Sequence, residues 1–192
     1  YTWASSTVQA HSGTKSAFIR YDAVAGGGED WLITPKYTVA ATDSIVFYLR
    51  LAFNGYQPDS LSIKVSTTDS ATTSFTGTLL ALKEGTNYPP NNTTWYRYAV
   101  SLAAYSGQNV FIAFKHYNVD GDGLYIDDVA IGTKPAAEIA ISTLTIPANS
   151  GVGAVITPQA TFVNNGSATQ TFNGTTTITP GGYTSTQTIT SL

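Results

Sequence analysis

The sequence contains no cysteine and no methionine in 192 residues. Without cysteine the chain has no disulfide framework and no thiolate metal site. This absence suits a reducing compartment, and it suits equally a secreted bacterial protein that uses neither thiols nor disulfides. Because the chain is rich in Thr, Tyr and Asn and poor in charge, we favour the second explanation.

Charge is also scarce, since Asp, Glu, Lys and Arg make up 11% of the residues, against roughly 25% in an ordinary soluble domain. The formal net charge is −3, and no run of basic residues occurs. The sequence therefore lacks the electrostatic footprint of a protein that binds nucleic acid or an anionic membrane. No apolar run approaches the roughly 18 residues of a transmembrane helix and no signal peptide is recognisable, so we predict no insertion into a membrane.

Clusters of Ala, Leu, Glu and Lys, which build amphipathic helices, are nearly missing, whereas β-branched Thr and aromatic Tyr are abundant. Short apolar runs recur between turns rich in Gly, Pro and Asn, and residues 61–65 alternate between apolar and polar side chains. We predict strands at residues 16–21, 31–33, 44–51, 61–65, 95–100, 109–117 and 124–131. Residues 109–114 are apolar on both faces, which is typical of a central strand. The pattern predicts an all-β fold, specifically a jelly-roll β-sandwich.

The composition changes after residue 132. A Gly-Thr-Lys-Pro stretch resembles a linker, and the chain beyond it has no Trp and hardly any charge. We predict a jelly-roll module at residues 1–132, a linker at 133–136 and a partial immunoglobulin-like β-sandwich at 137–192. About 7 strands in roughly 100 residues make a whole domain of that kind, so the second domain is expected to belong to a longer protein. The alternative is that its strands complete one larger sandwich.

Two adjacent aspartates interrupt the apolar strand predicted at 124–131. Simple alternation would bury Asp128 among the apolar residues, which is costly without a charge partner, a metal or several N–H donors. A β-bulge at Asp127 and Asp128 would instead return Val129 and Ile131 to the core and re-aim both carboxylates.

Two interpretations of this acidic pair stand side by side. One is a Ca²⁺ site, because this cation takes carboxylate and backbone oxygens, and Glu29 and Asp30 would supply further ligands. The other is that Asp127 and Asp128 accept backbone N–H bonds and cap a loop.

Catalysis finds little support in the sequence. The two histidines, His11 and His116, are far apart, and no Gly-x-Ser-x-Gly motif occurs. A Ser-His-Asp triad assembles in space, but His116 at a strand end is most simply a rim or packing residue. A glycosidase-like pair of Glu29 with Asp127 or Asp128 explains these carboxylates less simply than metal binding does. We therefore predict that the chain is not an enzyme.

Exposed aromatic side chains are another source of function, because they stack on sugars or grip proteins at low entropic cost. Tyr56, Tyr88 and Tyr117 fall in or beside predicted loops, and we predict that they bind ligand. Trp31 and Trp95 have apolar neighbours and are predicted to lie in the core.

Five segments occur in an order that resembles the cleaved-adhesin family, also called the choice-of-anchor J type. They are Glu29-Asp-Trp-Leu-Ile-Thr-Pro35, Leu61-Ser-Ile-Lys-Val-Ser-Thr67, Trp95-Tyr-Arg-Tyr98, Ser106-Gly-Gln-Asn-Val-Phe-Ile-Ala-Phe-Lys-His-Tyr-Asn118 and Leu124-Tyr-Ile-Asp-Asp-Val129. The resemblance implies a jelly roll similar in shape to MAM domains and carbohydrate-binding modules, as in the gingipain haemagglutinin domains and other Bacteroidetes surface proteins.

The resemblance also implies secretion or display on the exterior of the bacterial outer membrane, together with other domains of the same polypeptide. It implies binding of a host extracellular protein or glycan, and structural Ca²⁺ carried over to Asp30, Asp127 and Asp128. We expect a non-catalytic adhesion or recognition module. The alternative is a ligand-free spacer or export-associated domain of a secreted peptidase or glycosidase.

Overall fold

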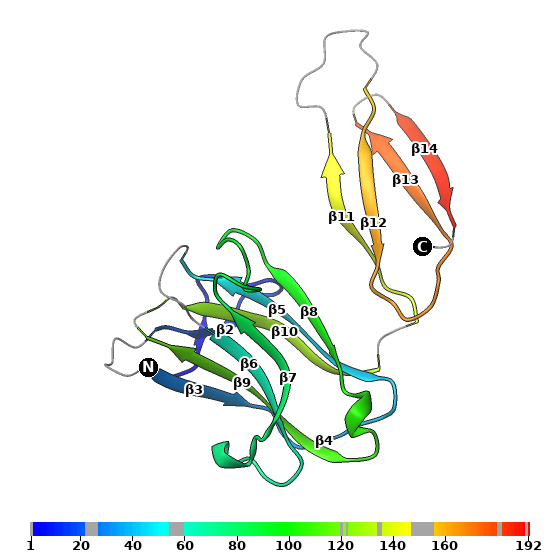
Figure 1. Cartoon of the computed structure of the whole chain (residues 1–192). Coiled ribbons are helices and arrows are strands. Elements are labelled where there is room, and N and C mark those ends of the chain that lie inside the picture. The colour runs from blue at the N-terminus through cyan, green and yellow to red at the C-terminus, as the bar shows by residue number, and fades with distance from the viewer. Residues whose placement is uncertain are drawn as a thin grey trace. The chain divides into compact units, whose positions relative to one another are not determined.

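Strands dominate the computed structural model of the chain. The helical elements of the described residues are two short 3-10 turns, Thr72–Ser74 (η1) and Ala103–Tyr105 (η2), and no helix there is long and apolar enough to cross a membrane. The chain divides into two compact units, Tyr1–Thr133 and Lys134–Leu192 (Figure 1). The structure describes residues 2–21, 27–53, 60–119, 121, 123–133, 136–146, 156–179, 182–190 and 192.

The first unit contains two antiparallel sheets. The first sheet has the order β1-β2-β10-β5-β8. Its strands are Ala4–Ser6 (β1), Ser16–Ile19 (β2), Leu124–Thr133 (β10), Asp43–Leu51 (β5) and Tyr96–Ser101 (β8). β5 shows how the sequence sets the two faces, because Ile45, Phe47 and Leu49 are fully buried while the residues between them are half-exposed. This sheet therefore has one face toward the core and one outer face.

The second sheet has the order β3-β9-β6-β7, with β4 also paired to β9. Its strands are Gly28–Ile33 (β3), Asn109–Asn118 (β9), Ser60–Ser66 (β6), Gly77–Lys83 (β7) and Tyr37–Thr38 (β4). β9 pairs with β3 and β4 along one edge and with β6 along the other, so the prediction of a central strand is confirmed.

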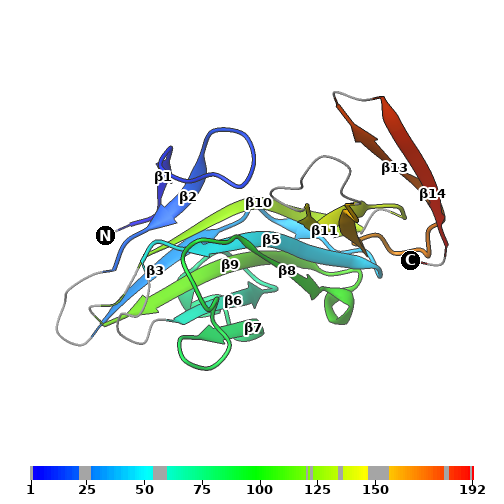
Figure 2. The ribbon, with the colours of Figure 1, turned by 90° about the horizontal axis from the view of Figure 1, so that it is seen from above.

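The core lies between these two sheets, and Figure 2 shows β10 and β5 in one layer and β6 and β7 in the other. Phe47 from the first sheet meets Phe114 from the second edge to face, with ring centroids 5.1 Å apart. Two facing antiparallel sheets around one apolar core confirm the predicted jelly-roll β-sandwich.

A buried carboxylate joins three segments of this unit. Asp43 at the start of β5 accepts hydrogen bonds from the Ala40 amide (2.7 Å) and the Tyr37 hydroxyl (2.8 Å). It also accepts one from the Thr133 hydroxyl (2.9 Å) at the end of β10. The bonds from Ala40 and Tyr37 hold the pKa of Asp43 below its usual value, and the contact with Asp43 raises the pKa of Tyr37.

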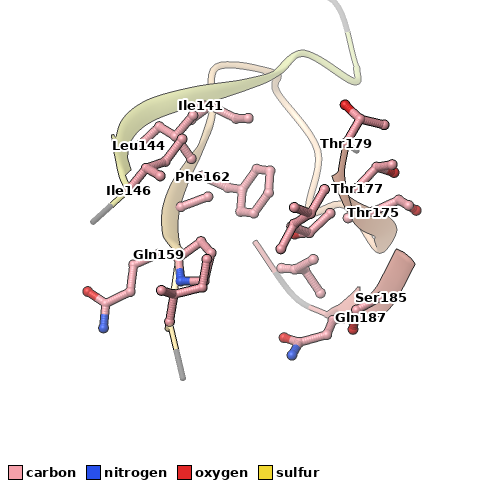
Figure 3. A pocket seen from close by; sticks show the side chains of 17 residues that line it. Ile141, Leu144, Ile146, Gln159, Phe162, Thr175, Thr177, Thr179, Ser185 and Gln187 are labelled. Atoms are coloured by element: carbon pink, nitrogen blue, oxygen red, sulfur yellow. The ribbon is translucent and has the colours of Figure 1, made fainter. Parts of the chain in front are cut away.

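The second unit consists of two hairpins around a hollow. Ile139–Thr145 (β11) pairs with Gln159–Asn164 (β12), and Phe172–Ile178 (β13) pairs with Tyr183–Ile189 (β14). A hollow of about 680 Å³ lies between them, and Figure 3 shows Phe162 and other side chains lining it. None of the described residues of this unit is fully buried. The described residues of this unit form four strands around an open interior, fewer than the roughly 7 strands of a complete immunoglobulin-like domain, and the partial domain of that kind stays a prediction.

Candidate functional site

β10 carries the predicted β-bulge at its acidic pair. Its register against β5 shifts between Asp127 and Ala130. The extra residue turns Ile131 inward, where it packs against the core, whereas Val129 stays 42% exposed. The bulge is therefore confirmed, but the predicted return of Val129 to the core is wrong. Val129 belongs to the irregular part of the strand, where side chains do not alternate.

Asp128 has a left-handed backbone conformation, with φ at 48°, and no other described residue except glycine has a positive φ. This region costs an L-residue about 1–2 kcal/mol, and Asp visits it more readily than most because its short side chain hydrogen-bonds locally. Such a conformation persists where contacts with the surrounding structure hold it in place. Here the contacts are made by His11 and Ser12, in the loop between β1 and β2.

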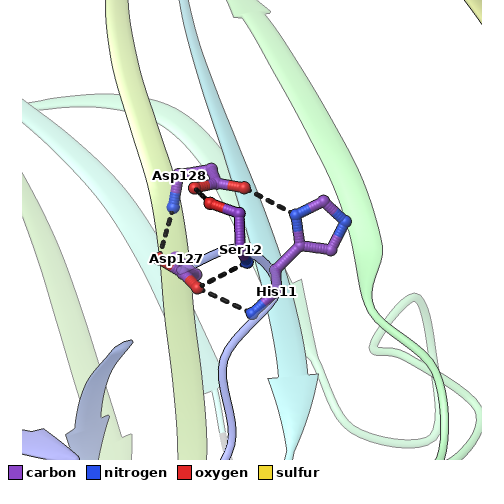
Figure 4. A network of polar contacts seen from close by, with 4 residues as sticks. All are labelled: His11, Ser12, Asp127 and Asp128. Atoms are coloured by element: carbon purple, nitrogen blue, oxygen red, sulfur yellow. Dashed lines mark hydrogen bonds and ion pairs between the residues drawn. The ribbon is translucent and has the colours of Figure 1, made fainter. Parts of the chain in front are cut away.

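Asp127 and Asp128 together clamp that loop, residues 7–15, onto β10 (Figure 4). Asp127 Oδ2 accepts hydrogen bonds from the backbone N–H groups of His11 (2.7 Å) and Ser12 (3.3 Å). Asp128 Oδ1 accepts one from the Ser12 hydroxyl (2.5 Å), and Asp128 Oδ2 lies 2.6 Å from His11 Nδ1. We call these four residues the clamp. The arrangement supports the loop-capping interpretation of the acidic pair.

The clamp is partly exposed to solvent, since the side chains of His11 and Asp128 are 32% and 33% exposed. Hydrogen bonds from His11 and Ser12 hold the pKa of Asp128 below its usual value. Asp128 is therefore ionised at neutral pH, as an acceptor for both donors.

The clamp is not a catalytic triad. A triad places histidine between the acid and the nucleophile, whereas here the Ser12 hydroxyl and the His11 ring both bond to Asp128. Within the described ranges no hydrogen bond joins Ser12 to a histidine. The other histidine, His116, is 0% exposed in the sandwich interior, so the predicted packing role is confirmed.

Glu29 and Asp30 lie on β3, in the sheet opposite to β10. Glu29 is on the outer face and forms an ion pair with Lys115 of β9, with Nζ and Oε1 2.5 Å apart. Asp30 is half-buried and stands directly opposite His116 in the β3–β9 register. The structure thus brings Asp127 and Asp128 together, and Glu29 and Asp30 are neighbours on a different sheet.

These four residues do not fit a Ca²⁺ ion as one set. Ca²⁺ takes 6–8 oxygen ligands, but all four carboxylate oxygens of Asp127 and Asp128 already accept bonds from the chain. Among the described residues no three His, Cys, Asp or Glu side chains gather where they would hold a metal. Asp120 and Asp122, which precede β10 in the sequence, lie outside the described residues.

The three tyrosines predicted to bind ligand have different surroundings. Tyr117 on β9 is 37% exposed, on the outer face of the second sheet beside Glu29. Tyr88 packs against the core and its hydroxyl is buried. The prediction that Tyr88 is exposed is wrong, because its Pro-rich loop folds its ring onto the sandwich. Tyr56 lies outside the described residues.

Trp31 and Trp95 are half-buried and do not belong to the core, so that prediction is also wrong. Trp31 lies on the outer face of the second sheet, where the Lys115 ammonium stands 5.2 Å from its ring centroid. Trp95 directly precedes β8. Alternation along β8 would have identified its face, because Tyr98 packs on the core and residues of the opposite parity, Arg97 and Trp95, therefore face outward.

Trp95 belongs to a group of rings on the outer face of the first sheet, which sequence reasoning missed. His11 stacks on Tyr48 with ring centroids 3.6 Å apart and planes at 16°. Trp95 stands edge-on to His11 at 5.8 Å and tilted to Tyr125 at 6.4 Å, and Phe18 stacks on Tyr125 at 4.6 Å. These five residues, called the ring cluster below, come from the clamped loop, β2, β10, β5 and the segment before β8.

The sequence profile of the Cleaved Adhesin Domain family matches residues 1–131. Hemagglutinin A of Porphyromonas gingivalis is 28% identical over 139 residues, which cover 63% of this chain and 5% of that protein. Hemagglutinin A of strain ATCC BAA-308 / W83 is 27% identical over the same length, covering 63% of this chain and 6% of that protein. The chain thus spans a small part of these relatives.

Solved structures of related domains show the same fold. The K1 cleaved adhesin domain of Lys-gingipain from P. gingivalis W83 has a TM-score of 0.54 and 19% identity, covering 69% of this chain and 83% of that one. The K2 domain of Lys-gingipain has a TM-score of 0.52 and 20% identity, covering 69% and 82%. Since the family profile extends over more than half of the sequence, the chain belongs to the Cleaved Adhesin Domain family.

Proposed function

We propose that the chain is a non-catalytic recognition module that binds a host extracellular protein or a glycan. The observation that supports this function is the placement of aromatic side chains on the outer faces of a rigid sandwich. A packed core would hold these rings inside, and a hydrolase would hold a nucleophile beside a base. In the described residues the serine, histidine and aspartate that come together form a clamp instead.

Both outer faces offer contact groups. On the second sheet, the exposed ring of Tyr117 lies beside the Glu29–Lys115 ion pair. On the first sheet, the ring cluster lies beside the clamp. Aromatic rings with adjacent hydrogen-bonding groups are the usual composition of a recognition surface.

We place this module outside the cell, secreted or on the bacterial surface, with other domains of the same polypeptide. The two haemagglutinins support this arrangement, because the chain corresponds to only 5–6% of their length. The low content of charge and the lack of cysteine agree with it.

Structural Ca²⁺ is a further part of the proposal, and it rests on the family resemblance alone. The geometry of Asp127 and Asp128 does not support it, since their oxygens accept bonds from His11, Ser12 and the Asp128 amide. If Ca²⁺ is bound, it would stabilise the folded chain by binding that state alone.

The function is tested by applying the whole chain, fluorescently labelled, to a slide that carries immobilised glycans and extracellular matrix proteins. We expect saturable binding to at least one glycan or protein. Unlabelled chain should compete for that spot, and chain unfolded in urea should not bind it. Absence of saturable binding to every spot would overturn the recognition function and favour a ligand-free spacer.

A further inference from the structure

We infer that the ligand surface is the ring cluster together with Arg97, and that its ligand is an uncharged glycan rich in hydroxyl groups. This inference rests on the proposed recognition function and narrows it to one face of the sandwich and one class of ligand. It also differs from the prediction made from the sequence, which placed recognition on Tyr56, Tyr88 and Tyr117.

The ring cluster provides a platform whose rings are held by contacts within the chain. Tyr48 and Tyr125 stand on neighbouring strands of the first sheet, Trp95 contacts Tyr125, and His11 is stacked over Tyr48. His11 and Trp95 lie across the deeper rings, and both retain partial exposure. The apolar C–H face of a pyranose is the kind of surface that stacks on such rings, and rings fixed in advance lose little entropy on binding.

Polar groups stand at the edge of this platform. Arg97 lies directly opposite Tyr48 in the β5–β8 register, on the outer face. Its guanidinium, with five N–H donors, forms no hydrogen bond or ion pair with the described residues. His11 donates through Nδ1 to Asp128, which leaves Nε2 of the neutral ring as an acceptor, and no described group bonds to Nε2. A sugar hydroxyl both donates and accepts, so neighbouring hydroxyls suit the donors of Arg97 and the acceptor of His11.

The positive φ of Asp128 has a functional explanation in this arrangement. A non-glycine residue held at positive φ is a form of local strain that concentrates at functional sites. Here the strain positions the carboxylate that orients the His11 ring over Tyr48. Asp128 is therefore a positioning residue.

Charge distinguishes between classes of ligand. On the outer face Asp127 and Asp128 of β10 are balanced by Arg50 of β5 and Arg97 of β8, and Arg20, which follows β2, donates to the Tyr21 hydroxyl at 3.3 Å. Arg50 is engaged, because its Nε donates to the Asn92 carbonyl at 2.9 Å. A sulfated or sialylated glycan would need an excess of basic residues here.

A protein ligand fits this face less well than a glycan. A stable protein interface covers about 800 Å² on each partner and has a desolvated apolar centre. In the ring cluster Tyr125 is only 7% exposed and Phe18, Tyr48 and Trp95 are half-buried, so none of these rings offers its whole surface to a partner. The exposed remainder is a set of ring faces and edges bordered by carboxylates, a guanidinium and a hydroxyl. That composition suits a sugar.

The test uses the whole chain and an array that carries neutral oligosaccharides ending in galactose, glucose, mannose or N-acetylglucosamine. Sialylated and sulfated glycans and matrix proteins are printed beside them. The variants are Trp95→Ala and His11→Ala, with Trp31→Ala as the matched control on the other sheet. We expect binding to a neutral glycan, weakened about tenfold or more by Trp95→Ala and His11→Ala, as loss of a stacking contact predicts. Trp31→Ala should bind like the wild type.

A folding defect is separated from a binding defect by measuring the unfolding midpoint of each variant, and by Arg97→Ala, which removes donors that no described residue uses. Arg97→Ala is expected to keep the midpoint and lose affinity. Binding lost in Trp31→Ala but kept in Trp95→Ala, or binding only to charged glycans or proteins, would overturn the inference and leave the recognition function standing. No binding to any spot by the wild type would overturn both.

Discussion

Substitution of Asp128 separates its two structural roles, the positive φ of its backbone and the hydrogen bonds of its carboxylate. Asp128→Ala removes both bonds and also leaves a Cβ in the left-handed region without a polar side chain to favour it. Asp128→Gly removes the same bonds but relieves the backbone. Asp128→Asn keeps the size and the tolerance for positive φ while removing the charge. The three variants therefore separate conformation from hydrogen bonding.

The magnitudes follow from the geometry. The two donors, from His11 and Ser12, are part-exposed and can turn to water, so we assign each bond about 1 kcal/mol rather than the higher value of a buried charged pair. The left-handed conformation adds about 1 kcal/mol against Ala. Asp128→Ala should therefore lower the free energy of unfolding by about 3 kcal/mol, Asp128→Gly by about 2 kcal/mol and Asp128→Asn by about 1 kcal/mol.

Urea unfolding followed by tryptophan fluorescence measures this series, because Trp3, Trp31 and Trp95 all lie in the first unit. Ala130 on the same strand provides the control, since its φ is not positive. Ala130→Gly should lower the free energy of unfolding of the first unit. Glycine is thus expected to give a more stable unit than alanine at position 128 and a less stable one at position 130. Equal losses for Asp128→Ala and Asp128→Gly would refute the argument from strain.

Two further predictions concern pH and Ca²⁺. Because His11 and Ser12 lower the pKa of Asp128, its stabilising contribution is present above the unfolded value of 3.8 and is lost as the pH falls through the lower folded value. The gap in unfolding free energy between wild type and Asp128→Asn should therefore shrink as the pH falls below 3.8, and a gap that does not change with pH in that range contradicts the assignment. Chelator should lower the melting temperature, and added Ca²⁺ should restore it. A hundredfold excess of Ca²⁺ over Kd would raise the free energy of unfolding by about 2.7 kcal/mol. An unchanged melting curve would remove Ca²⁺ from the proposal and leave recognition untouched.

The regular strands of the sandwich were predictable because their side chains alternate strictly. β5 and β6 place apolar residues at every second position, and the structure buries those residues. β7 was missed for the converse reason. Its register against β6 shifts between Ile63 and Lys64, and both Leu79 and Leu80 pack against the core. Two consecutive inward residues erase the period of two that marks a strand.

The aromatic residues were assigned to the wrong places because apolar neighbours are a poor guide to which face a side chain occupies. Trp95 precedes a strand with inward Tyr98 and Val100, and the parity of that strand puts it outside. Tyr88 sits among turn residues, but its ring covers the core. Alternation predicts which face of the sheet an aromatic side chain on a strand occupies. The position of an aromatic side chain in a loop depends instead on the path of that loop.

The clamp shows a limit set by distance along the chain. Two aspartates in an apolar strand already indicate that β10 departs from regular pairing, and the bulge followed from that conflict. The hydrogen-bond donors for these carboxylates are far away in the sequence, since His11 lies 116 residues from Asp127 and 117 from Asp128. Ca²⁺ and a distant loop are equal solutions at the level of sequence, because either supplies positive charge or N–H donors to the same oxygens. The chain uses its own loop, and the His11 ring that this loop carries completes the outer face on which we place the glycan.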